Sequence, residues 1–291
     1  MVRRRAKRRD AFKSFFNNYL VKSKKSYTPQ NIGELKNDYD LFISGSDQVW
    51  SPRCVGFDPA YFLTFADDRQ KYSYAASFAV PTLPDEFIDE YKKRLNGFQK
   101  FSVREPSGEK LVKELTGRTA ETHLDPTLLI SADEWKKIAV SKIDKPYILI
   151  FTANPAVSLV DFALKLSKEK NLPVYCINDA PHPVSHVINY IVAPTVEEFV
   201  GCFKNAEYVV TNSFHGTAFS VIFNKNLFVE FKNKSGRNIR SEGLLKSLGI
   251  DREIVDGNCN ETEINWDIIN AQLKTLGSKS KKYLSEIVNM E

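Results

Sequence analysis

Apolar and polar positions follow one another in blocks along the chain, and these blocks predict a repeated order of strand and helix. Short apolar runs predict buried strands at 39–45, 71–78, 100–105, 121–130, 146–151, 173–178, 207–211 and 226–231. Segments with apolar residues at helical spacing lie between these runs, at 83–98, 106–115, 156–171, 195–206 and 217–225. Ser131 has the N-cap chemistry for a further helix. Strands that alternate with helices favour parallel sheets joined by right-handed crossovers. We therefore predict an α/β protein with two Rossmann-like domains that face a cleft.

The domain boundaries follow from the place where the two series of elements meet, near residues 141–146. We predict a first domain at 1–142 and a second domain at 143–258. A helical pattern fills most of the remaining segment, 259–291, and we expect this tail to return and pack on the first domain.

The first 25 residues combine an apolar helical face with positive charge. The apolar positions recur at i, i+3, i+4, i+7 and i+8, and they are Phe12, Phe15, Phe16, Tyr19 and Leu20. This segment holds ten Lys or Arg and one acid, or +9, so the rest of a chain with net charge +5 carries 5 − 9 = −4. A basic character confined to one segment does not predict a nucleic-acid-binding protein. The segment fits a helix that attaches to an anionic membrane surface or polyanion. It equally fits a helix that docks on its own domain and leaves its basic end in water, and the regular aromatic face favours this second interpretation.

The composition is that of an ordinary globular protein, with 42% apolar and 26% charged residues in 291. No apolar stretch approaches the ~20 residues of a membrane helix, and the N-terminus lacks the apolar core of a secretory signal. We expect a cytoplasmic protein, peripheral to the inner face of the membrane if residues 1–25 bind lipid. Its cysteines, Cys54, Cys176, Cys202 and Cys259, lack the spacing of a disulfide framework or a zinc site. His182 and His186 flank Pro183 and have no evident third ligand, so we predict no metal.

Polar loops follow three of the predicted strands, at 44–48, 103–105 and 211–216. Ligands of open parallel sheets gather at such positions, beyond the carboxyl ends of the strands. The third loop, "TNSFHG", leads from a strand into a helix whose N-terminal N–H groups and dipole suit a phosphate. Ser213 and Thr217 add hydroxyl donors, Gly216 permits close backbone approach, and His215 can donate to an anion or transfer a proton.

Each of these loops also has a plain structural interpretation, which the residues alone favour. Ser213 and Thr217 fit helix caps, and His215 fits a satisfied surface or core histidine. Asp47 fits an N-cap, and Arg104 with Glu105 fits a solvated ion pair. Asp125, before Pro126, fits the start of a turn.

Five longer segments change this balance, because they occur together in the order and at the spacing of one family. "DLFISGSDQVW", "YSYAASF", "FSVREPSGEKLVKELTG", "HLDPTLLI" and "AEYVVTNSFHGTAFSVIFNKNLFV" resemble the polysaccharide pyruvyl transferase family, and "RSEGLLKSLGIDR", from Arg240, is similar to a further segment. The resemblance covers residues 38–285. It implies a GT-B-like fold with the active site between the domains. It also implies transfer of pyruvyl from phosphoenolpyruvate to sugar hydroxyls, which builds a ketal on bacterial cell-surface polysaccharides such as capsule and exopolysaccharide.

The resemblance also implies roles for single residues. His215 is expected to contact the donor phosphate and Arg104 the donor, while Asp47 is the candidate to take the proton of an acceptor hydroxyl. The further substrate-binding residues are Gly45, Ser46, Gln48, Asp125, Asn212, Ser213, Gly216, Thr217 and Arg240, the last as a third anchor of the donor. The implied partners are phosphoenolpyruvate and a saccharide or lipid-linked saccharide acceptor, with no cofactor and no metal.

Three departures from the family pattern, and two rival functions, accompany the resemblance. Family members usually begin with a strand, an "NYG"-like loop and a helix, whereas "NNYL" at 17–20 lies in the basic helix, so the first domain is expected to lack its N-terminal βα unit. Ser213 stands where some branches carry an arginine, and Ala79 replaces a frequent glycine.

One rival function is a GT-B nucleotide-sugar glycosyltransferase that binds a diphosphate at 211–216. The other is a catalytically silent subunit of a polysaccharide assembly machine, bound through residues 1–25.

Overall fold

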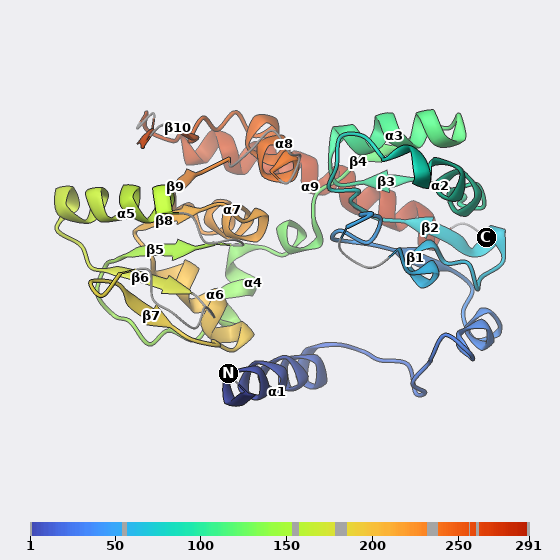
Figure 1. The fold of residues 1–291 in the computed structure, drawn as a ribbon, viewed down its shortest axis with the longest axis horizontal. Coiled ribbons are helices and arrows are strands. Elements are labelled where there is room, and N and C mark those ends of the chain that lie inside the picture. Colours follow the sequence, from blue (N-terminus) through green and yellow to red (C-terminus); the bar gives the residue numbers. More distant parts are fainter. Residues whose placement is uncertain are drawn as a thin grey trace. The chain divides into compact units, whose positions relative to one another are not determined.

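The computed structural model describes residues 2–53, 57–152, 157–177, 185–231, 238–255, 257–259 and 262–289, with side chains from Ala6 onward. These residues divide into two compact units (Figure 1). Unit 1 comprises Met1–Ser23, Ile130–Lys232 and Gly249–Trp266, and unit 2 comprises Lys24–Leu129, Asn233–Leu248 and Asp267–Glu291. This grouping differs from the predicted 1–142, 143–258 and 259–291, because the first helix packs in the unit of the second sheet and the last helix packs with the first strands.

Unit 1 is built on a five-stranded parallel sheet with the order β7-β6-β5-β8-β9. The strands are β5 (Ile148–Phe151), β6 (Val174–Ile177), β7 (Asn189–Ile191), β8 (Tyr208–Thr211) and β9 (Asn226–Val229). Central β5 pairs with β6 on one side and β8 on the other, where Ile150 faces Cys176 and Val210. The strand order therefore reverses between β5 and β8. Four of these strands were predicted, but β7 was missed because its three residues carry no pattern.

The α-helices of unit 1 have ends that follow from local chemistry. They are α1 (Val2–Tyr19), α4 (Ala132–Ile138), α5 (Val157–Lys170), α6 (Val196–Asn205) and α7 (Phe214–Ile222). Among them, α5 and α7 pack directly on strands of the sheet. The Ser131 hydroxyl accepts from the Glu134 amide at 3.2 Å and caps α4, as predicted. Thr195 and Glu198 form a capping box at the start of α6. The antiparallel pair β10 (Ile254–Val255) and β11 (Asn258–Cys259), which was not predicted, completes the unit.

Unit 2 contains four short parallel strands: β1 (Phe42–Ser44), β2 (Lys71–Ser73), β3 (Ser102–Val103) and β4 (Glu121–Thr122). β1 pairs with β2 and β3 with β4, and a bridge between Ala76 and Val103 connects the two pairs. The strand predicted at 121–130 is wrong beyond Thr122. The Asp125 carboxylate accepts from the Thr127 amide at 3.0 Å, and Pro126 has no N–H for a ladder, so Pro126–Leu129 form a 3-10 turn instead.

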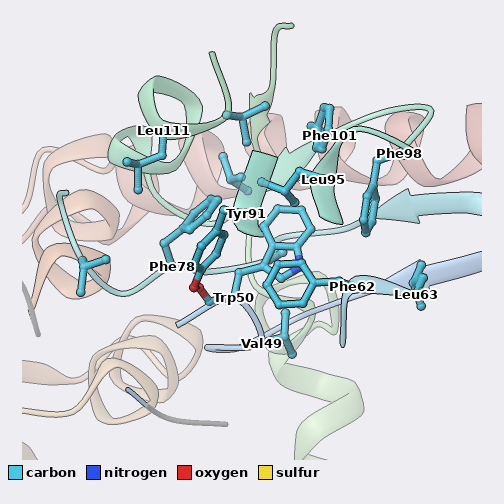
Figure 2. Close-up of a cluster of buried hydrophobic side chains, with 14 of the residues drawn as sticks. Val49, Trp50, Phe62, Leu63, Phe78, Tyr91, Leu95, Phe98, Phe101 and Leu111 are labelled. Carbon is cyan, nitrogen blue, oxygen red and sulfur yellow. The ribbon is translucent and has the colours of Figure 1, made fainter. Parts of the chain in front are cut away.

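The core of unit 2 is an aromatic cluster around Trp50 (Figure 2). Trp50 is fully buried, and its ring centroid lies 5.3 Å from those of Phe78 and Phe98. The Tyr91 hydroxyl donates to the Trp50 carbonyl at 2.6 Å. The indole N–H of Trp50 donates in turn to the Tyr61 carbonyl at 3.2 Å. This core holds one end of the segment "GSDQVW" rigidly, which fixes the turn that carries Asp47.

The remaining helices of unit 2 are α2 (Ile88–Leu95), α3 (Pro106–Thr116), α8 (Ile239–Ser247) and α9 (Trp266–Val288). Tyr283 of α9 packs against Tyr72 and Tyr74, and its hydroxyl donates to the Ser73 carbonyl at 3.0 Å. The last helix therefore packs on the first strands, as expected. Within the part of the chain that the structure describes, no helix is both long and apolar enough to cross a membrane.

Candidate functional site

The turn between β8 and α7 lies where the strand order of unit 1 reverses. α7 begins at Phe214, not at the predicted Thr217, so His215 lies within its first turn. The cause is Ser213, whose extended backbone (φ −108°, ψ 138°) ends the strand segment and whose carbonyl accepts from the Thr217 amide at 3.0 Å. N–H groups of a first helical turn lack partners within the helix, and the helix dipole adds positive potential there. The potential at the start of α7 therefore suits an anion.

The predicted residues of this turn divide into packed and accessible side chains. Thr217 is fully buried, and its hydroxyl donates to the Ser213 carbonyl at 3.1 Å. A Cβ on Gly216 would lie 2.1 Å from Thr211 Oγ1, so the glycine is required where the helix meets β8. Asn212 and His215 are half-buried and reach the surface of unit 1.

Unit 2 holds a second group of predicted residues, which we call the charged cluster: Asp47, Arg104, Asp125 and Arg240. Arg104 follows β3, and its Nη1 donates to Asp125 Oδ2 at 2.8 Å while its Nη2 donates to Asp47 Oδ1 at 3.0 Å. Arg240, on α8, donates from Nη1 to the same Asp47 oxygen at 3.2 Å. Asp47 and Asp125 follow β1 and β4, so the cluster gathers at the carboxyl ends of the parallel strands.

Burial divides the charged cluster into an inner pair and an outer pair. The side chains of Arg104 and Asp125 are 1% and 4% exposed. Asp125 Oδ1 accepts from the Thr127 amide and hydroxyl, and Asp125 Oδ2 lies 3.0 Å from the Ser46 hydroxyl. A buried ion pair with these added hydrogen bonds holds its geometry firmly.

Asp47 and Arg240 form the outer pair. The Asp47 side chain is 61% exposed and that of Arg240 is 11% exposed. Both guanidinium groups contact Asp47 Oδ1, and no hydrogen bond to Asp47 Oδ2 is present among the residues that the structure describes. With its amide oxygen turned toward α8, Gln48 accepts from Arg240 Nη1 at 3.2 Å. The accessible acceptor of the cluster is therefore Asp47 Oδ2.

Gly45 and Ser46 place the Asp47 turn against β2. Gly45 has φ +123°, and a Cβ there would lie 2.1 Å from the Tyr74 carbonyl oxygen. The Asp47 carbonyl accepts from the Ser77 amide at 2.9 Å, and the Trp50 amide donates to the Ser77 carbonyl at 3.2 Å. Gly45 is thus needed for backbone packing beside the cluster.

Glu105 supports the same turn, although its sequence context fitted a solvated ion pair with Arg104. That interpretation is wrong, because Glu105 is fully buried. Its Oε1 accepts from the Ser77 hydroxyl at 2.9 Å and from the amides of Phe78 and Ala79 at 3.0 and 3.1 Å. Burial raises the pKa of this carboxyl, against the opposing effect of these hydrogen bonds. The position of Glu105 directly after a buried strand and before a helix-starting proline was its only sequence signal.

No group of three or more His, Cys, Asp or Glu could hold a metal ion within the described ranges, which exclude His182. Cys176 and Cys202 are buried free thiols, Cys259 is half-buried, and Cys54 lies outside the described residues.

Residues 2–229 match the family described as polysaccharide pyruvyl transferase. The match begins before residue 38 and ends before Arg240, so it places the basic helix inside the family's range and leaves the Arg240 segment outside it. No curated protein matches the chain.

The fold of this chain is similar to that of solved enzyme structures. A UDP-GlcNAc 2-epimerase from Methanocaldococcus jannaschii, in complex with UDP-GlcNAc and UDP, superposes with TM-score 0.53 at 12% identity, over 97% of this chain and 88% of that one. The E. coli heptosyltransferase WaaC with ADP-2-deoxy-2-fluoro heptose gives TM-score 0.38 at 12% identity, over 79% and 76%. The likeness to the epimerase, at 12% identity, shows the fold alone, and it confirms the predicted α/β fold with parallel sheets of the GT-B-like kind.

Proposed function

The chain belongs to the polysaccharide pyruvyl transferase family, and from this premise we propose that it transfers pyruvyl from phosphoenolpyruvate to two hydroxyls of one sugar. The product is a cyclic ketal on a saccharide of cell-surface polysaccharide biosynthesis. The observation that carries the proposal is the anion-receiving turn at the start of α7, with His215 and Asn212 accessible at the point where the strand order reverses.

The donor needs at least two anchors, because phosphoenolpyruvate carries a phosphate and a carboxylate. We assign the phosphate to the first turn of α7 and His215, which together stabilise the charge that develops as phosphate leaves. Within unit 2 we assign a contact with a substrate anion to Arg240, since its side chain is more exposed than that of Arg104, at 11% against 1%. Arg104, held by two carboxylates, then positions Asp47 and Asp125 and does not contact the donor itself.

Asp47 suits the role of general base. Its Oδ1 is held by Arg104 and Arg240 and its side chain is 61% exposed, so we assign Oδ2 as the atom that takes the proton of an acceptor hydroxyl. Two guanidinium groups on one oxygen orient the carboxylate without occupying the oxygen that reacts.

The reaction balances with the donor and a diol alone. The vinyl carbon gains a proton and becomes a methyl group, and the first sugar hydroxyl adds to the neighbouring carbon. The second hydroxyl then displaces phosphate from that carbon and closes the ketal. Of the two hydroxyl protons lost, one is balanced by the proton gained at carbon and the other leaves with the phosphate.

The test separates binding of the donor from turnover. Phosphoenolpyruvate should raise the unfolding temperature of the wild type and of Asp47→Asn, but not that of His215→Ala. With [2-13C]phosphoenolpyruvate and a panel of saccharides, the wild type should release phosphate and form a ketal carbon visible by NMR. Asp47→Asn should lose about a hundredfold in rate. Asp133→Asn and His186→Ala, at exposed positions of unit 1, are the matched controls and should behave as wild type.

Two results would replace the proposal. Stabilisation by a nucleotide sugar such as UDP-GlcNAc, without stabilisation by phosphoenolpyruvate, would favour a GT-B glycosyltransferase. Stabilisation by neither ligand, with His215→Ala indistinguishable from wild type, would favour a catalytically silent subunit.

A further inference from the structure

The basic N-terminal helix α1 does not dock through its aromatic face. α1 packs beside α6 in unit 1 (Figure 1), and its half-buried positions are Ala6, Ala11 and Phe15. The other four apolar side chains of the segment are 44 to 47% exposed, and they are Phe12, Phe16, Tyr19 and Leu20. The interpretation that the sequence favoured, in which the aromatic face is covered by the protein itself, is therefore wrong for all of this face except Phe15.

These four side chains form one stripe along the helix, which we call the aromatic stripe. Phe12, Phe16 and Tyr19 are spaced by four and three residues, so they lie on one side of the helix, and Leu20 follows beside them. Val21, fully exposed, extends the apolar character past the end of the helix. An exposed stripe of this kind on a helix is uncommon unless it meets an apolar partner.

Basic side chains share the side of the helix that carries the aromatic stripe. The Arg8 guanidinium lies 5.8 Å from the centroid of the Phe12 ring, and Lys22 Nζ lies 5.8 Å from that of Phe16. Within residues 1–23 the chain carries eight Lys or Arg and one Asp, or 8 − 1 = +7. The positive charges therefore lie beside the exposed aromatic rings, so a surface that covers the rings would also contact the cations.

We propose that α1 lies on an anionic lipid surface, with the aromatic stripe at the level of the headgroups and the flanking Arg and Lys among the lipid phosphates. The charge complements an anionic bilayer, and the apolar stripe supplies the burial that charge alone does not give. A nucleic acid is the weaker candidate, because Leu20 and Val21 extend the stripe with aliphatic side chains on which no base stacks. The contact is independent of the reaction that the protein performs.

The experiment is co-sedimentation of the full chain with lipid vesicles. The wild type should sediment with vesicles of phosphatidylcholine containing one third phosphatidylglycerol, and not with pure phosphatidylcholine vesicles. High salt should weaken the binding, because it screens the basic side chains. This arm needs no variant, so the proposal can fail even if every substitution disturbs folding.

Two variants divide the contact into charge and apolar burial. Arg8→Gln/Arg9→Gln/Lys13→Gln should weaken binding about a hundredfold, since one basic side chain near an anionic surface contributes about fivefold. Phe12→Gln/Phe16→Gln should weaken it about tenfold or more at unchanged charge. The matched control is Lys274→Gln/Lys281→Gln/Lys282→Gln, which removes three exposed lysines from α9 and should leave binding unchanged. Circular dichroism and the unfolding temperature check that each variant is folded.

Three results would overturn the proposal. The first is equal sedimentation with neutral and anionic vesicles. The second is unchanged binding of both α1 variants. The third is tight binding to a DNA duplex under conditions in which anionic vesicles leave the protein in the supernatant.

Discussion

Acidification should unfold the protein in part through one buried histidine, His123. Its side chain is 1% exposed, and its ring lies 4.5 Å from that of Tyr283 and 6.1 Å from that of Tyr74, between centroids. Nδ1 lies 2.8 Å from the Ser102 hydroxyl oxygen. Burial lowers the pKa of His123 from 6.5 to about 4, although the nearby Glu121 carboxylate acts in the opposite direction. The folded protein thus holds a neutral imidazole at a pH where the unfolded chain carries a charged one.

The sign and size of the effect follow from linkage. Above pH 6.5 both states hold a neutral His123, and the stability that depends on it is fully present. As the pH falls from 6.5 to about 4, the unfolded chain binds the proton first, and stability is lost across this window. One pKa unit corresponds to about 1.4 kcal/mol, so the loss at the acid end is about 3 kcal/mol.

The assay is urea unfolding of the wild type and His123→Gln at a series of pH values across this window. The variant loses the ring contacts and should be less stable at neutral pH. Its free energy of unfolding should fall less steeply with acid, so the difference between the two proteins should narrow by about 3 kcal/mol. Carboxyl groups titrate in both proteins and cancel in the difference. The exposed His186→Gln is the matched control, with a curve parallel to wild type. Parallel curves for His123→Gln would refute the reasoning.

Three further predictions concern packing and the support of the charged cluster. The variant Glu105→Gln should keep the three hydrogen bonds to Oε1. Because burial raises the pKa of Glu105, the stability of the variant relative to wild type should improve as the pH rises through the range where Glu105 ionises. Urea unfolding at acid and neutral pH measures this, and a stability difference independent of pH would contradict it. Gly216→Ala should destabilise by about 1–3 kcal/mol, because the new Cβ would lie 2.1 Å from Thr211 Oγ1; an unchanged unfolding temperature would show that α7 shifts freely. Gly277→Ala should stabilise the protein by about 1 kcal/mol, because a Cβ at this position of α9 would have nothing within 4 Å. Gly201→Ala should destabilise the protein, because its Cβ would lie 2.0 Å from the Val140 carbonyl oxygen. Equal unfolding temperatures of the two variants would contradict both assignments.

Local pattern alone determined most of the regular structure. The runs at 146–151 and 207–211 are buried strands because uninterrupted apolar residues need cover on both faces, and they were found without tertiary information. The Ser131 cap was found because its chemistry acts within one helical turn. β7 and β11, of three and two residues, were missed because so short a segment has no period of its own, and only pairing with a neighbour makes it a strand. The equally short β1 to β4 were found because they lie within the longer runs predicted at 39–45, 71–78, 100–105 and 121–130.

The candidate chemistry divides in the same way. Motifs identified the family, and they singled out His215, Asp47 and Arg104 as candidates. They did not reveal that Arg104 is buried between two carboxylates, or that Glu105 supports the turn of Asp47 through Ser77. These contacts join residues far apart in sequence, since the charged cluster draws on positions 47, 104, 125 and 240.

The sequence also did not predict which side of α1 packs against the protein. The spacing of its aromatic residues determined a helix and its apolar side. Which side meets the protein depended on the surface of α6, and the half-buried pair Ala11 and Phe15, four residues apart, marks the side that this surface accepted. A period within one segment determines what that segment can form, but burial and pairing are properties of two segments, and only the folded chain brings those together.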